Sequence, residues 1–166
     1  MKKLLALLLI IPLLFSCEGE MGPPGQDGLD GISILGQVFE AQVDFNTGND
    51  FQVLVDFPSQ IEVYDTDVVL AYILAGTDNG VDIWEPLPQT LFFNEGILLY
   101  GYNHTYADIE FFLDGTVSFE DLIPELTQDI IFRIAILPAD AAQSLDLNNL
   151  ESVMSALQNQ EIIKLN

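Results

Sequence analysis

The sequence predicts a mostly β protein in which residues 34–166 form one antiparallel β-sandwich-like domain with a short C-terminal helix. Apolar and polar residues alternate with period two after residue 34, which is typical of half-buried strands. Short apolar segments then recur about every ten residues with turn-forming residues between them, a spacing typical of sandwiches. Hydrophobic residues make up 49% of the 166 residues and charged residues 18%, so the chain can bury a core. A closed barrel is the alternative that the same pattern allows.

The first two strands are expected at 39–45 and 51–57, where the odd positions are apolar. The residues between them, 46–50, are polar apart from Gly48. Two alternating segments across a short, Gly-containing turn predict an antiparallel hairpin with one solvent-exposed face, which Pro58 ends.

A continuous apolar segment at 68–75 predicts a strand that is buried on both faces. Asn148 and Glu151 fit a helix capping box, and apolar residues at helical spacing follow, so a helix is predicted at 148–158. Further strands are expected at 81–84, 89–93, 97–102, 109–113, 116–119, 130–137 and 161–165.

The N-terminus has the pattern of a secretory signal peptide. Lys2 and Lys3 precede an almost wholly apolar segment of eleven residues at 4–14. This segment is too short for a membrane span, which needs about 20 residues. A basic start before a short apolar segment is instead typical of an export signal.

The end of this leader, Leu14-Phe15-Ser16-Cys17, resembles a bacterial lipobox, although Phe15 departs from the commonest pattern. The resemblance implies that residues 1–16 are removed and that Cys17 is acylated, which would anchor the protein stably to a membrane. The alternative is an ordinary signal peptide that contains a cysteine. Because Cys17 is the only cysteine, the sequence excludes a disulfide framework and a zinc–thiolate cluster.

Five consecutive Gly-X-Y triplets occupy residues 19–33. Collagen needs glycine at every third position because no other residue fits at the axis of its triple helix. Residues 17–33 are therefore interpreted as the acylated cysteine and an extended spacer, in which the fifteen residues of the repeat, 19–33, would reach roughly 45 Å at about 3.1 Å per residue. The alternative is a stalk that assembles three chains, so we expect a monomer or a weak trimer.

The order of lipobox, short collagen-like repeat and acidic β-rich domain is similar to that of the small collagen-like lipoproteins of Bacteroidota. The resemblance is specific over residues 1–33 and implies an outer-membrane lipoprotein held through Cys17. Glu18 and Glu20 also resemble the surface-export signal of that group, which implies display on the outer surface of the cell.

The chain is strongly acidic, with 26 acidic and 4 basic residues. Removal of the leader leaves Arg133 and Lys164 as the only basic residues and a formal net charge of −24. Such a domain has no basic surface for nucleic acid and is repelled by anionic lipid headgroups. Arg133 lies within the predicted strand 130–137, where we expect it to form an ion pair with a carboxylate. The alternatives are that its charged end reaches solvent at a sheet edge or that it contacts a ligand.

The sequence favours a binding or structural role over catalysis. The single histidine, His104, has no recognisable nucleophile motif beside it, and no Gly-rich phosphate loop follows a strand. A carboxylate-dependent hydrolase remains an alternative, because in so acidic a chain the spacing of carboxylates does not identify a catalytic pair.

Calcium is the one metal for which the sequence offers ligands. Asp78 and Asp82 flank a Gly-containing turn, with Glu85 nearby, and carboxylate oxygens are the ligands that Ca²⁺ requires. The alternative is that these residues only form a turn.

Aromatic residues supply the candidate surface for a protein or glycan ligand. Tyr100, Tyr102, His104 and Tyr106 alternate, so one continuous strand would place all four on the same face. If exposed, this ladder would stack on a ligand; if buried, it would be cross-strand packing. The same two interpretations apply to Trp84, which prolines follow at two nearby positions.

Overall fold

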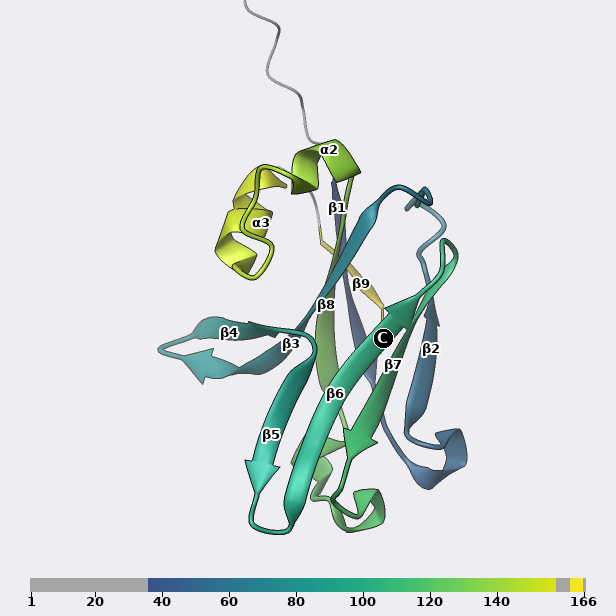
Figure 1. Cartoon of the computed structure of the whole chain (residues 1–166), viewed down its shortest axis with the longest axis vertical. Helices are drawn as coiled ribbons and strands as arrows, with labels where there is room; N and C mark the ends of the chain where they lie inside the picture. Colours follow the sequence, from purple (N-terminus) through teal and green to yellow (C-terminus); the bar gives the residue numbers. More distant parts are fainter. Residues whose placement is uncertain (1–35, 158–161, 166) are drawn as a thin grey trace, which may run out of the picture. The chain divides into compact units, whose positions relative to one another are not determined.

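The computed structural model describes residues 36–157 and 162–165, which form a sandwich of two β-sheets (Figure 1). One sheet has five strands in the order β4-β3-β8-β1-β9, and the other has four in the order β2-β7-β6-β5. All neighbouring strands are antiparallel except β1 and β9, which run parallel. The predicted fold class, a mostly β sandwich with a short helix near the C-terminus, is confirmed.

The expected strands and the final helix are found with small changes of boundary, except that no strand forms at 116–119. The strands are β1 (Gln37–Val43), β2 (Gln52–Asp56), β3 (Val68–Asp78), β4 (Val81–Pro86), β5 (Gln89–Phe93), β6 (Gly96–His104), β7 (Asp108–Gly115), β8 (Ile130–Leu137) and β9 (Ile163–Leu165). The helices are α2 (Ala139–Ala142) and α3 (Leu150–Ala156), and single 3₁₀ turns are η2 (Thr47–Asn49), η3 (Phe119–Asp121) and η4 (Pro124–Leu126).

The hairpin predicted between residues 39 and 57 is wrong. β1 pairs with β8 and β9 in the five-stranded sheet, whereas β2 pairs with β7 in the other sheet. The connection begins with Asn46, whose side chain caps η2, so the chain crosses from one sheet to the other. Both strands point their apolar residues into the same core, and the alternating pattern is therefore the same for a crossing as for a hairpin.

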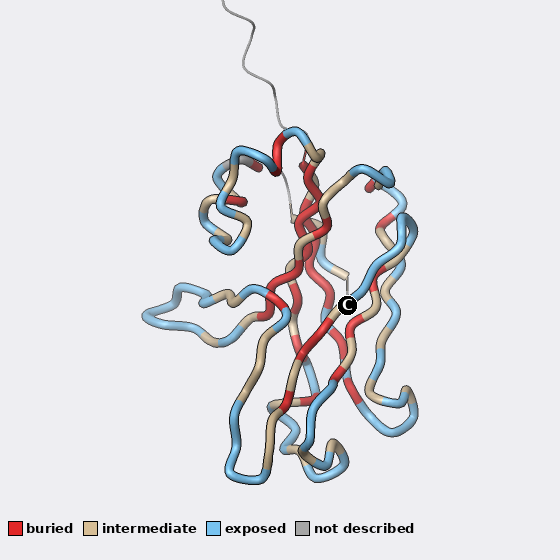
Figure 2. The backbone as a smooth tube through the Cα atoms, in the orientation of Figure 1, coloured by how far each residue is buried: buried red, intermediate tan, exposed pale blue. Residues whose placement is uncertain are grey.

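The main core lies between the two sheets, where the buried residues concentrate (Figure 2). At its centre Phe111 of the four-stranded sheet stacks on Phe132 of the five-stranded sheet, with ring centroids 4.0 Å apart and an interplanar angle of 5°. Phe45 packs edge-on against Phe132 and tilted against Tyr100. These aromatic contacts join the two sheets across the sandwich.

A second, smaller core covers part of the outer face of the five-stranded sheet. Its buried members are Val38, Ala135, Leu137, Ala142, Val153 and Leu157. This cover explains why β3 is buried on both faces in its first half, as predicted for 68–75. The helix that supplies the cover is capped by Asn149, which accepts a hydrogen bond from the Ser152 N–H, one residue later than the predicted cap at Asn148.

The second half of β3 and the whole of β4 form a hairpin that projects from the sandwich (Figure 1). Asn79 and Gly80 make its turn, with φ angles of 50° and 82°. Asn-Gly is the preferred pair for a two-residue hairpin turn in which both residues need positive φ.

The chain enters the described structure at Gly36, at the end of the sandwich where α2 lies (Figure 1). The predicted signal peptide, the acylation site at Cys17 and the Gly-X-Y repeat fall on residues 1–33 and lie outside the described residues. Within 36–157 and 162–165, no helix is both long and apolar enough to cross a membrane.

Candidate ligand-binding pocket

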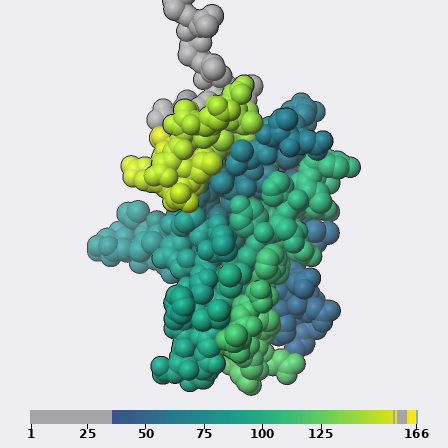
Figure 3. Space-filling view, viewed as in Figure 1, coloured from purple at the N-terminus to yellow at the C-terminus, as the bar shows by residue number. Residues whose placement is uncertain are grey.

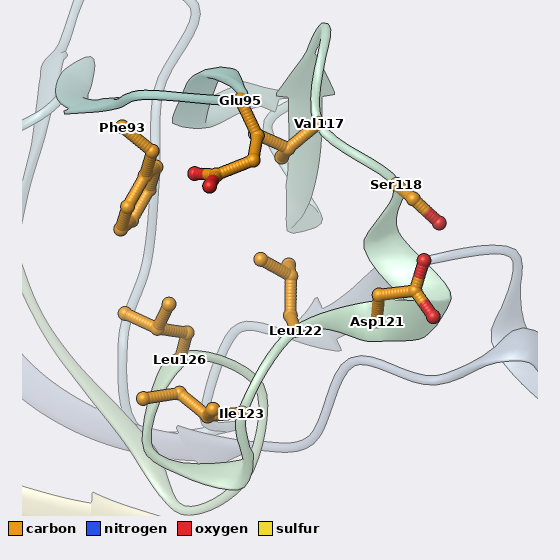
Figure 4. A pocket seen from close by; sticks show the side chains of 8 residues that line it. All are labelled: Phe93, Glu95, Val117, Ser118, Asp121, Leu122, Ile123 and Leu126. Atoms are coloured by element: carbon orange, nitrogen blue, oxygen red, sulfur yellow. The ribbon is translucent and has the colours of Figure 1, made fainter.

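A pocket of about 300 Å³ opens at the end of the sandwich opposite to Gly36 (Figure 4). Its volume is at the lower limit of the range in which proteins bind small ligands or single side chains. The floor and walls are mostly apolar, and two carboxylates stand at the rim. The lining residues are Phe93, Glu95, Val117, Ser118, Asp121, Leu122, Ile123 and Leu126.

The side of the pocket formed by residues 93–95 is held by close backbone packing between β6 and the end of β7. Gly115 has a φ of 142°, and a Cβ atom there would lie 2.1 Å from the Ile97 carbonyl oxygen. The Thr116 N–H donates to the same Ile97 carbonyl, and the Thr116 hydroxyl accepts from the Ile97 N–H. This close contact turns the chain away from the sheet after Gly115, so that Val117 and Ser118 line the pocket and the strand predicted at 116–119 does not form.

The opposite wall, η4, is held by Tyr100, which sequence analysis proposed as a ligand-binding residue. Tyr100 is 2% exposed, and its hydroxyl donates a 2.7 Å hydrogen bond to the Leu126 carbonyl. Burial raises the pKa of Tyr100 to about 12, so the hydroxyl stays protonated and keeps donating. The ring of Tyr100 is therefore not available at the surface. Its hydroxyl instead positions η4, which forms this wall of the pocket.

The rim of the pocket carries negative charge on exposed side chains. Figure 4 shows Glu95 reaching over the cavity toward Phe93, with Asp121 at the other side beside Ser118. Ile123 is 57% exposed at the mouth. The pocket thus combines an apolar interior with an anionic rim, which suits an apolar group that carries or adjoins a positive charge.

The two positive charges of the described chain are engaged elsewhere, on the outer face of the five-stranded sheet. The Arg133 Nε and Nη2 atoms lie 3.0 and 2.5 Å from Oε1 of Glu40, and Lys164 Nζ lies 3.1 Å from Oε2. The ion pair predicted for Arg133 is confirmed. Burial by itself raises the pKa of Glu40, but the hydrogen bonds and charges of the two cations outweigh it and hold this pKa below 4.5.

Trp84 belongs to this same outer-face cluster. The Arg133 guanidinium carbon lies 3.9 Å from the centre of the Trp84 ring, a cation–π contact that leaves the indole half-buried. Trp84 therefore packs on Arg133 beside its ion pair with Glu40, and it also lines a separate, more open pocket with Val81, Asp82, residues 148–151 and Met154.

The remaining aromatic candidates do not form one exposed ladder. Tyr102 is half-buried and donates to the Val69 carbonyl over 3.1 Å, so it packs toward the core. β6 ends at His104, and Tyr106 follows in the loop, where it is 70% exposed. Alternate residues share a face only within a continuous strand. β6 includes Tyr100 and Tyr102 but ends before Tyr106.

The predicted calcium ligands are spread over the projecting hairpin. Thr77 is opposite Asp82 and Asp78 is opposite Val81, so Asp78 and Asp82 belong to opposite faces. Glu85 instead accepts a hydrogen bond from the Gln89 side chain. In the described part of the chain, no three His, Cys, Asp or Glu side chains are grouped so that they could hold a metal ion.

The pattern of the sequence does not identify the residues that line the pocket. They come from two distant segments, 93–95 and 117–126, which the tight contact at Gly115 brings together. The one signal in the sequence is a cluster of apolar residues, Leu122, Ile123 and Leu126, in a Pro-containing segment without strand or helix periodicity.

Comparisons with protein-family models, with curated proteins and with solved structures gave no match. The fold and the pocket together define a β-sandwich domain with an apolar, acid-rimmed pocket at one end.

Proposed function

We propose that this protein is a lipid-anchored lipoprotein of the cell envelope that binds a ligand in the pocket at the end of its β-sandwich. The observation that carries the proposal is the apolar pocket lined by Phe93, Leu122 and Ile123 at the end far from Gly36. The lipobox-like segment ending in Cys17 supports the anchor, and the Gly-X-Y repeat supports a spacer between the anchor and the sandwich.

The direction of the chain is consistent with an anchor at one end of the sandwich and a pocket at the other. An anchor at Cys17 connects to the sandwich through Gly36, and β1 then runs to the opposite end, where the Phe45 N–H donates to the Thr127 carbonyl beside η4. The pocket therefore lies at the end of the sandwich opposite to the end at which the chain enters it.

The anchor is tested by a Cys17→Ala variant in cells. We expect the wild-type protein in the membrane fraction and the variant released from it, because no acyl chain can be attached without the thiol. If the protein is displayed on the outer surface, protease added to intact cells will cleave the wild type. Cleavage only after the envelope is opened would contradict surface display, and a membrane-bound variant would contradict the anchor.

The pocket is tested by Ile123→Asp with a neutral, environment-sensitive apolar dye as the probe. We expect the wild-type domain to bind the dye and shift its emission to the blue, and the variant to lose at least about tenfold in affinity, because a charge at the mouth is costly to desolvate. Leu54→Asp is the matched control, since Leu54 is 60% exposed on β2 and Ile123 is 57% exposed. Equal loss in both variants, or no binding by the wild type, would contradict a binding pocket.

A further inference from the structure

The described structure has four edge strands, and they differ in how they are protected against pairing with another chain. Edge strands present unpaired N–H and C=O groups, and natural proteins block them with charged residues or proline. β2 carries Asp56, β4 carries Asp82, Glu85 and Pro86, and the short β9 carries Lys164. β5, with the sequence Gln-Thr-Leu-Phe-Phe, carries none of these.

β5 is also the edge strand with the most exposed large apolar side chain. Within the described residues it pairs with β6 and with no other strand. Phe92 is 82% exposed, and the next residue, Phe93, lies on the opposite face of the strand and lines the pocket. In Figure 3 the β5–β6 hairpin forms the lower left of the molecule, far from the helices.

The free edge of β5 and the pocket are therefore continuous at Phe93. A strand added along this edge would have successive side chains directed alternately toward the face of Phe92 and toward the face of Phe93 and the pocket. Five residues of β5 give room for about five residues of an added strand, roughly 17 Å.

The negative charge around the β5 edge favours some partner segments over others. Glu95 and Asp121 stand at the pocket rim, and the described chain's two basic residues, Arg133 and Lys164, are bound to Glu40 on the other sheet. A basic segment would be attracted to this region, and an acidic one would be repelled.

We propose that β5 and the adjoining pocket bind an extended segment of a partner protein in which apolar and basic residues alternate. The backbone of the segment would add as a fifth strand to the four-stranded sheet, and one apolar side chain would enter the pocket. This inference rests on the proposed function, because it names the class of ligand for the same pocket.

A second copy of this chain is the less suitable occupant. Pairing two β5 strands would bring together two domains that each carry a large negative charge. Like charges placed together across an interface oppose association.

The test is calorimetric titration of the mature chain, residues 17–166 with Cys17→Ala, with the peptide acetyl-KVKLKVK-amide. We expect binding that weakens as salt is raised. The acidic peptide acetyl-EVELEVE-amide should not bind. The basic peptide N-methylated at its five inner residues keeps its side chains and charges but has lost those N–H donors. Its affinity should fall about tenfold or more, because several main-chain hydrogen bonds are lost.

Phe92→Lys should weaken the basic peptide by a similar factor, because it places a positive charge on the face of β5 toward which the lysines of the added strand point. Leu54→Lys on the opposite edge strand is the matched control and should leave affinity unchanged; thermal melts check that both variants are folded. Strand addition would be overturned if the N-methylated peptide bound as tightly as the basic peptide. It would also be overturned if the basic peptide bound Phe92→Lys as tightly as the wild type.

The outcomes separate the two proposals. Dye binding without peptide binding would overturn the peptide segment and leave the pocket as a binding site for another ligand. If the wild-type protein binds neither the dye nor the peptide, the pocket is overturned as a binding site as well. Self-association of the mature chain that Phe92→Lys abolishes, without peptide binding, would assign the edge to a second copy and overturn the proposed partner.

Discussion

Replacing Phe132 by alanine is expected to lower the free energy of unfolding by about 3–5 kcal/mol, the usual cost of truncating a buried phenylalanine. Phe132 is fully buried and stacks on Phe111 of the opposite sheet, with Phe45 packed edge-on beside it. The substitution removes the apolar surface of the ring and leaves a cavity between the sheets. Since small domains are stable by only about 5–15 kcal/mol, much of the stability would be lost.

Urea unfolding followed by circular dichroism measures this effect. Phe92→Ala is the matched control, because it removes the same side chain where it is 82% exposed, and we expect a change within about 0.5 kcal/mol. A loss below about 1 kcal/mol for Phe132→Ala would contradict the packing of the two sheets on these rings.

The second large effect is expected from Glu40→Gln, which should destabilise the protein by about 3 kcal/mol near pH 7. The Glu40 side chain is 9% exposed and the Arg133 side chain 14% exposed, so the substitution leaves a largely buried guanidinium without its anion. Lys164→Met is the control within the same cluster. Its side chain is 70% exposed, and the expected loss is about 0–1 kcal/mol.

The effect of Glu40→Gln should depend on pH with a definite sign. The pKa of Glu40 is lowered in the folded protein, so the folded state favours the charged carboxylate. Its stabilising contribution is therefore complete above the ordinary value of 4.5 and is lost as pH falls through the lower, folded value. Urea midpoints of the two proteins should converge below about pH 4.5. A difference that stays constant or grows on acidification would contradict the ion pair.

The strands were predictable because each is a local pattern of alternating or continuous apolar residues. The segments 68–75 and 130–137 coincide closely with β3 and β8. The pairing was not predictable in the same way, and the hairpin expected between 39 and 57 crosses between sheets instead. A strand with alternating apolar residues buries the same face in either sheet, so its sequence does not determine which strand it pairs with.

The candidate site was less predictable than the fold. Tyr100 was selected for its aromatic ring, but it lies behind the pocket and holds η4 through its hydroxyl. The lining residues Leu122 and Ile123 belong to a segment without strand or helix periodicity, and their proximity to Phe93 of β5 depends on the close contact at Gly115. Exposure and proximity are properties of the folded chain, and spacing along the sequence does not report them.

The sequence by itself determined that this protein is mostly β and strongly acidic. The sequence also favoured a carboxylate partner for Arg133, because a guanidinium in an apolar strand is costly to leave unpaired. Only the tertiary structure decided which carboxylate. The antiparallel register of β1 and β8 sets Glu40 opposite Arg133, across 93 residues of chain, although the sequence contains 25 other acidic residues. An arginine within an apolar strand indicates that a carboxylate must lie nearby. Which carboxylate it is depends on the strand register, and the packing of both sheets on one core sets that register.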